Sequence, residues 1–442
     1  MKRDAYDLVT STDSHEARRA FENAVYGLAT HKPSTGMALA ATLSADPDHA
    51  AGHALKGFAN LILARSELKP TADDALAEAR RALHAIDGGT KDERVLVEAL
   101  QAACSGSFHG AVAVLEAGFD DRPATFLPFK LAQALRFMTG DHAGMLASAR
   151  RAADAAPRSG PATGFIHGCH AFALEEAGRY DEALREGELA VALQPEDSWG
   201  LHAVSHVHEM RGDTQLGIRW LEDSRGAWSR CNNFSFHMAW HLALLHLERG
   251  DHARVLDLYD DEVRPQQTDD FRDMANAVSL LWRLNQMGVH VGSRWDDLSD
   301  IARNRQTDTT LVFAALHNLA ALVAVEDHAA AATLVREIEA KAAGTDDQAR
   351  VAAEVGIPLA RMLAGMGAPA DRQMLDRMML NLPKIGGSNA QRDFFMLALA
   401  KALGRSGDHA GLSHVGLVRG NLKREDQLLR TIKRATGMQQ NA

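Results

Sequence analysis

The sequence has 442 residues, of which 46% are hydrophobic and 24% are charged, and its formal net charge is −10 at pH 7. This composition supplies enough apolar material for a large folded body and argues against extended disorder. A mildly acidic chain lacks the basic stripe that phosphate binding requires, which disfavours a nucleic-acid partner.

Three cysteines, Cys104, Cys169 and Cys231, are too few and too widely spaced to predict a disulfide framework or a paired metal knuckle. The N-terminal stretch has acidic residues where a secretory signal would be apolar. No apolar run approaches the roughly 18–20 residues of a membrane span. We therefore expect a cytoplasmic protein without a membrane partner, and we leave open a homodimer.

The first predicted elements are amphipathic helices at residues 53–68 and 73–85. They belong to an N-terminal helical segment that we place at residues 1–90. The remaining chain divides into a repeat region at 91–265 and a C-terminal region of degenerate helical repeats at 266–442.

A repeat with a period close to 34 residues organises the middle of the chain. Five glycines each follow one apolar helix and precede a second, at steps of 34, 38, 34 and 38 residues: Gly106, Gly140, Gly178, Gly212 and Gly250. A glycine suits the left-handed position at the end of a helix. A period of 34 residues is that of the tetratricopeptide repeat, a pair of antiparallel helices.

The clearest repeat lies at residues 164–197 and matches the tetratricopeptide consensus at Ala171, Leu174, Gly178, Tyr180, Ala183, Ala190 and Pro195. Small alanines allow two helices to pack closely, and a proline ends the second helix. Weaker helical hairpins follow at 311–343, 347–365 and 391–419, the last interrupted near Gly407. The sequence therefore predicts an all-α fold, an α-solenoid of stacked helical hairpins with no strand of useful length.

Functional residue types occupy the repeat positions that line the concave groove of tetratricopeptide proteins. Counting from Gly212 places four residues there, Trp199, His202, His206 and Glu209. The next repeat adds His237 and Trp240, with His241 adjacent. The paired histidines lie one helical turn apart, so their side chains share a face. We predict that His202, His206, Glu209, His237 and His241 converge in one catalytic site. A groove position also predicts that His206→Ala costs under about 1 kcal/mol of stability.

All six tryptophans of the chain also fall between residues 199 and 295. Large aromatic side chains beside a few convergent polar groups are typical of a small-molecule pocket. A small-molecule substrate or ligand is therefore the expected partner.

Five blocks of sequence carry a resemblance to a known family. They are 197–210 (DSWGLHAVSHVHEM), 237–244 (HMAWHLAL), 258–260 (LYD), 288–295 (GVHVGSRW) and 386–393 (GGSNAQRD). In order and separation these blocks resemble the tetratricopeptide repeat protein 38 family, from about Lys91 onward. The resemblance implies the fold and the location of the site, but no reaction. The residues that we select as ligand-binding candidates are Asp197, Trp199, Trp240, Tyr259, Arg294, Trp295, Ser388, Asn389, Gln391 and Arg392.

The last block has two interpretations. Ser388 and Gln391 form the pattern of a capping box, which is a sufficient structural reason for both residues. Glycines that lead into a helix N-terminus beside Arg392 also form an anion site. We favour a role facing a ligand.

Two chemical mechanisms fit the histidine cluster. Two HxxxH pairs and a carboxylate can bind a divalent metal, zinc or iron, through His202, His206, His237, His241 and Glu209. Without a metal, histidine acts as general acid or base while Glu209 or Asp197 fixes its tautomer. Both support a hydrolase or lyase, and the metal-free mechanism is the leading prediction.

The rival hypothesis is a non-catalytic tetratricopeptide scaffold that holds a peptide or partner protein in its groove. Peptide-binding repeats usually place Lys, Arg and Asn at the groove positions, whereas this chain has Trp, His and Glu. The basic residues near the C-terminus, Arg419, Lys423, Arg424, Arg430, Lys433 and Arg434, are interpreted as the solvated face of a terminal helix.

Overall fold

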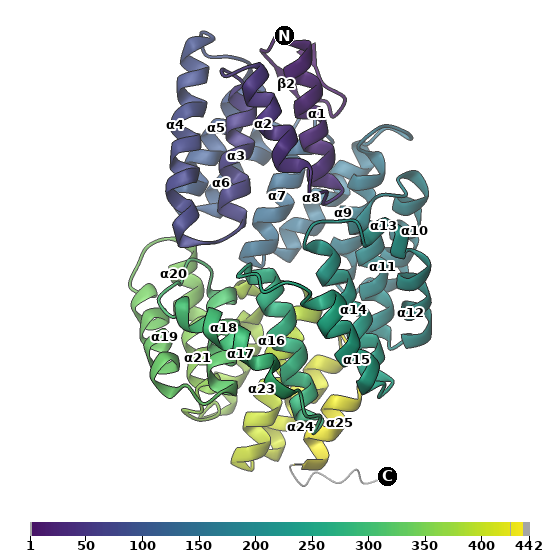
Figure 1. Ribbon diagram of the computed structural model, residues 1–442, viewed down its shortest axis with the longest axis vertical. Helices are drawn as coiled ribbons and strands as arrows, with labels where there is room; N and C mark the ends of the chain where they lie inside the picture. Colours follow the sequence, from purple (N-terminus) through teal and green to yellow (C-terminus); the bar gives the residue numbers. More distant parts are fainter. Residues whose placement is uncertain (1, 425, 436–442) are drawn as a thin grey trace. The chain divides into compact units, whose positions relative to one another are not determined.

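The computed structural model describes residues 2–424 and 426–435, which form two compact units (Figure 1). The first unit extends to Val204 and includes Arg225–Phe234. The second comprises Ser205–Ser224 and the described residues from Ser235 onward. The chain passes from one unit to the other within helix α11 (Ser198–Arg211). The predicted division at residues 90 and 265 stays a prediction.

The first unit consists of antiparallel helices after one short strand pair. Strands β1 (Lys2–Arg3) and β2 (Val9–Thr10) pair antiparallel, with Lys2 opposite Thr10. The helices are α1 (His15–Ala29), α2 (Thr35–Ala45), α3 (Ala50–Ile62), η1 (Ser66–Leu68), α4 (Lys69–Ala85), α5 (Lys91–Cys104), α6 (Phe108–Gly118), α7 (Phe126–Thr139), α8 (His142–Ala155), α9 (Thr163–Glu176), α10 (Tyr180–Leu193), the first half of α11 and α13 (Arg225–Trp228).

The second unit also consists of helices, and four of its segments are 3-10 or π helices that continue or precede an α-helix. It contains the second half of α11, α12 (Thr214–Asp223), α14 (Phe234–Glu248), α15 (His252–Leu258), η2 (Tyr259–Val263), α16 (Phe271–Gln286), η3 (Gly292–Arg294), α17 (Trp295–Asn304), α18 (Val312–Ala324), α19 (His328–Lys341), α20 (Asp347–Val351), η4 (Ala352–Gly356), α21 (Ile357–Leu363), α22 (Arg372–Asn381), η5 (Leu382–Ile385), α23 (Asn389–Ser406), α24 (His409–Gly420) and α25 (Gln427–Ala435). Together the two units confirm the predicted all-α fold.

The five repeat glycines end helices as predicted. Each follows one helix of a pair, namely α5, α7, α9, α11 and α14, and each has a φ angle between 67° and 82°. This left-handed conformation is accessible to glycine without a Cβ clash. The second helix of each hairpin then begins two residues after the glycine. The steps of 38 residues coincide with longer connections, one of which contains α13.

Helix α10 shows why small residues recur within a repeat. Ala183 and Ala190 are completely buried. A Cβ atom on Gly164 of α9 would lie 2.5 Å from the Cβ of Gln194, just after α10. The two helices therefore approach too closely for larger side chains at these places. Pro195 follows the last residue of α10 by two positions, as the consensus predicts.

Two predicted helices differ in detail. The helix predicted at 53–68 ends at Ile62, because Ala64 adopts a left-handed conformation with φ of 52°, and a short 3-10 helix follows. The region predicted as a hairpin at 347–365 is a single helical run, with the π-helix η4 between α20 and α21. Helices α18 and α19, and the break at Gly407 between α23 and α24, agree with the prediction.

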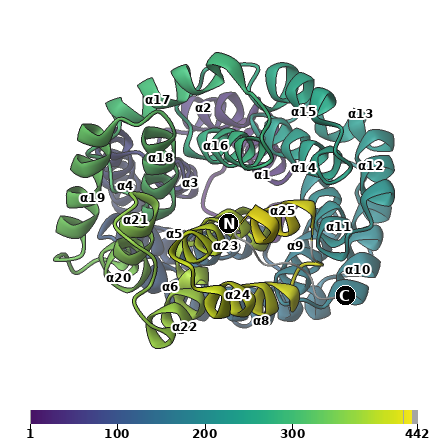
Figure 2. The same cartoon turned by 90° about the horizontal axis from the view of Figure 1, so that it is seen from below.

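Within the second unit, α16 contacts both α23 and α25, and α23 also contacts α25 (Figure 2). Among the described helices, none combines the length and apolar composition needed to cross a bilayer.

Candidate functional site

Helices α11 and α14 supply four of the five predicted catalytic residues to the second unit. His206 and Glu209 lie in the second half of α11, and His237 and His241 lie one turn apart on α14. All four side chains are buried, and His206 and His241 have no exposed surface. The predicted groove positions are therefore interior positions of the fold, which corrects the expectation of a surface site. The small stability cost predicted for His206→Ala assumed a groove position, so this burial removes its premise.

His241 is at the centre of the cluster. Its Nδ1 lies 2.9 Å from Glu209 Oε2, and its Nε2 lies 3.2 Å from His237 Nε2. The other ring nitrogen of His237, Nδ1, lies 3.0 Å from Oδ1 of Asn276 on α16. The ring of His206 packs 4.4 Å from that of His241, centroid to centroid.

With the Asn276 amide in its present orientation, these contacts assign the imidazole protons. Glu209 offers only an acceptor, so His241 donates through Nδ1, and in the orientation of its amide Asn276 likewise accepts from Nδ1 of His237. In neutral rings both Nε2 atoms then carry a lone pair, and these two atoms face each other at 3.2 Å. Two facing lone pairs repel unless a cation lies between them. Two nitrogens in this arrangement can hold a shared metal ion.

The dimensions of the cluster fit this interpretation. Two nitrogen ligands of tetrahedral zinc, each about 2.0–2.1 Å from the ion, are separated by roughly 3.3 Å. The observed Nε2–Nε2 distance is 3.2 Å. His206, His237 and His241 can each offer a ring nitrogen such that these atoms lie within 4.8 Å of one another. Hydrogen bonds from the other ring nitrogen to oxygen acceptors are the usual outer contacts of metal-bound histidines.

The indole of Trp240 borders the cluster. It stacks on His237 at 5.3 Å and meets His241 edge-on at 4.8 Å. Its Nε1 is buried without a hydrogen-bond partner among the described residues. A buried donor of this kind is costly unless it is satisfied, so it also fits a bound group beside the histidines.

The charges at the cluster favour neutral histidines and an ionised carboxylate. Burial, and then the neighbouring His206, lower the pKa of His241 to about 4. Burial and His241 hold the pKa of His237 well below its ordinary value. Burial alone would raise the pKa of Glu209, but the Lys423 ammonium and the His241 hydrogen bond outweigh it and hold that pKa well below 4.5. Neutral imidazole is the form that binds a metal.

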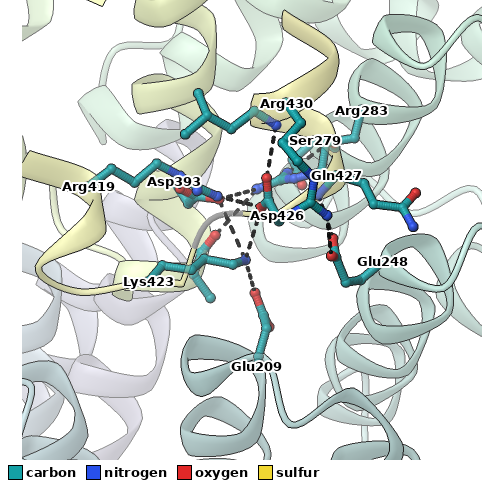
Figure 3. A network of polar contacts seen from close by, with 12 residues as sticks. Glu209, Glu248, Ser279, Arg283, Asp393, Arg419, Lys423, Asp426, Gln427 and Arg430 are labelled. Carbon is teal, nitrogen blue, oxygen red and sulfur yellow. Dashed lines mark hydrogen bonds and ion pairs between the residues drawn. The ribbon is translucent and has the colours of Figure 1, made fainter. Parts of the chain in front are cut away.

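An ion network lies on the other side of Glu209 (Figure 3). Lys423 Nζ donates to Glu209 Oε1 at 2.7 Å and lies 3.6 Å from Asp393. Arg419 binds Asp393 through two contacts, of 2.5 and 2.9 Å, and Arg283 lies 3.8 Å from the same carboxylate. The network also includes Asp426, so its three cations, Arg283, Arg419 and Lys423, match three carboxylates, Glu209, Asp393 and Asp426.

This network corrects the interpretation of the basic C-terminal residues. Arg419 is 3% exposed and Lys423 is 9% exposed, so neither belongs to a solvated face. Their burial is compensated by carboxylates from other helices, Asp393 on α23 and Glu209 on α11. Arg430 is half-buried and lies 3.4 Å from Glu248. Arg424 and Arg434 are exposed, as predicted.

A pocket of about 290 Å³ reaches Glu209 from the side of this network. Its lining combines Glu209, Glu248, Arg283 and Lys423 with leucines of α14, and none of the cluster histidines contributes to it. Glu209 therefore lines the pocket and also contacts His241 of the cluster.

The fifth predicted catalytic residue, His202, lies in the part of α11 that belongs to the first unit. Its ring packs among aromatic side chains, 5.4 Å from Phe172, 5.1 Å from Trp199 and 5.3 Å from Phe234. On the helix it precedes His206 by one turn. Its catalytic role stays a prediction.

The ligand candidates of the first unit are Asp197 and Trp199. Asp197 is buried and accepts hydrogen bonds from the backbone of Trp199 and Gly200 at the start of α11. Burial raises the pKa of Asp197 to about 7. The half-buried Trp199 ring carries the Lys130 ammonium 4.6 Å from its centroid.

Tyr259, Arg294 and Trp295 lie in the second unit. Tyr259 begins the π-helix η2 and is buried, as is Trp295. Arg294 forms a two-contact ion pair with Asp260, at 2.8 and 2.6 Å. These contacts are structural, and binding of a ligand by the three residues stays a prediction.

The GGSNAQRD block forms the capping box that its sequence predicts. Ser388 accepts from the backbone N–H of Gln391, and the Gln391 side chain accepts from the backbone of Ser388. Arg392 donates to the carbonyl of Gly387 and to Asn389 Oδ1. A ligand role for Ser388, Asn389, Gln391 and Arg392 stays a prediction beside these contacts.

Sequence reasoning missed Asn276 and Arg283, and it interpreted Arg419 and Lys423 as part of a solvated face. Asp393 belongs to the last of the five sequence blocks, but that motif does not single it out as a site residue. Asn276 and Lys423 carry no local motif, since their importance depends on which helices become neighbours.

No protein-family model matches the chain. Among solved structures, a match is found to a complex of Naa15 and Naa10 bound to HypK-THB, with 15% sequence identity and a TM-score of 0.27. The match covers 95% of this chain and 64% of that chain, so this chain spans less than two thirds of the length of the protein it matches. The helical-repeat fold is assigned from the glycine-closed helical hairpins themselves.

Proposed function

We propose that the chain is a helical-repeat protein that binds a divalent transition metal, zinc or iron, through His206, His237 and His241. The observation that carries this proposal is the 3.2 Å separation of two imidazole Nε2 atoms whose Nδ1 atoms both face oxygen acceptors. Glu209 and Asn276 would fix the rings from outside the ligand shell.

Such an ion supplies Lewis-acid chemistry and lowers the pKa of bound water. This supports the hydrolase or lyase class predicted from the sequence as the proposed activity. The pocket beside Glu209 is the proposed place for a small-molecule substrate, since a residue of the cluster lines it. Glu209 would hold the His241 ring in the tautomer whose Nε2 can bind the ion.

The metal-free acid–base mechanism is a second candidate, and one observation favours it. Nδ2 of Asn276 is buried without a hydrogen-bond partner among the described residues. Rotating this amide by 180° would let Nδ2 donate to His237 Nδ1. His237 could then donate through Nε2 to His241, which donates to Glu209, so that a continuous proton relay forms without an ion.

The burial of the cluster disfavours the rival scaffold hypothesis at these positions. A peptide that lay along α11 and α14 would have to reach His206 and His241, which have no exposed surface. The resemblance to the tetratricopeptide repeat protein 38 family is likewise a proposal, based on the motifs quoted above.

Metal analysis of the purified chain tests the proposal. We expect near-stoichiometric zinc or iron in the wild type, or after reconstitution with zinc, and a loss of that metal in His241→Ala. The control is His246→Ala, because His246 lies on the same helix but contacts Asp251 rather than the cluster. A wild-type protein that retains no metal after reconstitution would overturn the proposal.

Two substitutions of Asn276 separate the candidates. Asn276→Asp keeps an acceptor for His237 Nδ1 and should preserve metal binding, whereas Asn276→Leu removes the acceptor and should weaken it by about 10- to 100-fold. The proton relay requires a donor at this position, which neither variant supplies. A metal-free activity that both substitutions abolish would therefore favour the relay.

A further inference from the structure

The described residues just before and within α25 reach back to the helices that carry the histidines. We define residues 419–424 and 426–430 as the C-terminal strap. The backbone N–H of Arg424 donates to the carbonyl of Met210 at the end of α11, at 2.9 Å. The backbone N–H of Gln427 donates to Glu248 at the end of α14, also at 2.9 Å. The strap thus holds the ends of both cluster helices.

Lys423 is the member of the strap that touches the cluster. It contacts Glu209 Oε1 at 2.7 Å, while the other oxygen of the same carboxylate, Oε2, faces His241 at 2.9 Å. One carboxylate therefore connects an ammonium and an imidazole. A carboxylate that is held by one oxygen still rotates broadly about its terminal side-chain bond. Glu209 is held at both oxygens, so this rotation is limited.

The remaining contacts of the strap keep Lys423 in place. Arg419 holds Asp393 through two hydrogen bonds, and Asp393 lies 3.6 Å from Lys423 Nζ. The Lys423 ammonium is thereby held between two carboxylates (Figure 3). A lysine that only balanced the charge of Glu209 would not need the second contact, with Asp393.

We infer that Lys423 is a positioning residue of the metal site, which fixes the Glu209 carboxylate and through it the orientation of the His241 ring. This inference rests on the proposed function. It assigns to the C-terminal strap the task of completing a site whose ligands all lie on α11 and α14. Charged outer contacts of this kind typically change metal affinity by about 10- to 100-fold.

Cobalt(II) binding to the full chain tests this inference, because its visible absorption reports both affinity and ligand geometry. Lys423→Met should weaken cobalt binding by about 10- to 100-fold and shift the absorption bands. Lys423→Arg, which keeps a donor for Glu209, should recover part of both. The matched control is Arg430→Met, which removes a strap cation that contacts Glu248 but not Glu209; it should bind cobalt like the wild type.

A double-mutant cycle tests whether Lys423 acts through Glu209. In a Glu209→Gln background, adding Lys423→Met should change cobalt affinity by no more than about twofold. A change of that size is within the deviation from additivity seen for substitutions that do not interact. This double variant removes the pair together, so it remains informative if Lys423→Met alone does not fold.

The outcomes are separable. A wild type that does not bind cobalt overturns the proposed metal site and the inference with it. A wild type that binds cobalt while Lys423→Met retains the same affinity and spectrum overturns only the role of Lys423. An equal loss in both backgrounds also overturns it, because Lys423 would then act independently of Glu209.

Discussion

Asp393→Asn should be one of the most destabilising single substitutions in the second unit. Asp393 is 5% exposed and accepts two hydrogen bonds from Arg419, with Lys423 and Arg283 within 3.8 Å. Asparagine keeps the shape of the side chain but removes its charge, so that three buried cations share the remaining carboxylates. Removing one partner of a buried ion pair typically costs about 3–5 kcal/mol.

Urea unfolding of the full chain, followed by circular dichroism, measures this cost. The control is Asp376→Asn, since Asp376 also pairs with an arginine, Arg372, but its side chain is 51% exposed. That substitution should cost much less, because solvent screens an exposed ion pair. If Asp393→Asn destabilises the protein no more than the control, the buried ion pairs of Asp393 do not stabilise the fold.

The same carboxylate predicts acid sensitivity. Burial would raise the pKa of Asp393, but the charges of Arg419 and Lys423 outweigh it and lower the pKa from 3.8 to about 2. A lowered folded-state pKa gives stability that is present above pH 3.8 and is lost as the pH falls towards 2. The amount is about 2 kcal/mol. Asp393→Asn should lack this component, so its stability should fall less steeply than that of the wild type between these pH values.

Three further outcomes follow from individual contacts. Gly250→Ala should cost about 1 kcal/mol in thermal or urea unfolding, because φ is 77° but no side chain crowds the position; a neutral effect would contradict the role of the left-handed turn. His206→Ala should cost about 2–5 kcal/mol, as for other large buried side chains, and a cost under 1 kcal/mol would show that the interior tolerates the cavity. Cys169 is buried, and burial raises the pKa of its thiol, so a thiol reagent should modify it only in denaturant; rapid modification of the native chain would contradict its burial.

The helical hairpins could be predicted because their signals are local. Gly178 and Pro195 act within one repeat: the glycine allows a left-handed turn after α9, and the proline follows the end of α10. The same is true of the capping box at Ser388, whose two hydrogen bonds span three residues. Repeats are favourable for sequence analysis because each one specifies its own turn.

The candidate site could be predicted only in part. The one-turn spacing of His237 and His241 placed them together correctly, and the repeat register brought Glu209 to His241. The same register did not reveal that these positions are buried, because burial depends on the helices that cover them. The partners that orient the cluster, Asn276 and Lys423, come from helices or segments with no fixed register relative to α11.

The contact between Glu209 and Lys423 also has a consequence for biosynthesis. The two residues are 214 positions apart, whereas most hairpins of this fold close within about 34 residues. At translation rates of about 5–20 residues per second, the Glu209 carboxylate is made roughly 10–40 s before its cationic partner. During that interval α11 and α14 can already have formed, since their hairpins are local, but the buried acid between them lacks the ammonium that neutralises it. We therefore expect this part of the second unit to stay open until Lys423 has been synthesised. Ribosomes stalled before residue 423 should then display a protease-sensitive α11–α14 region.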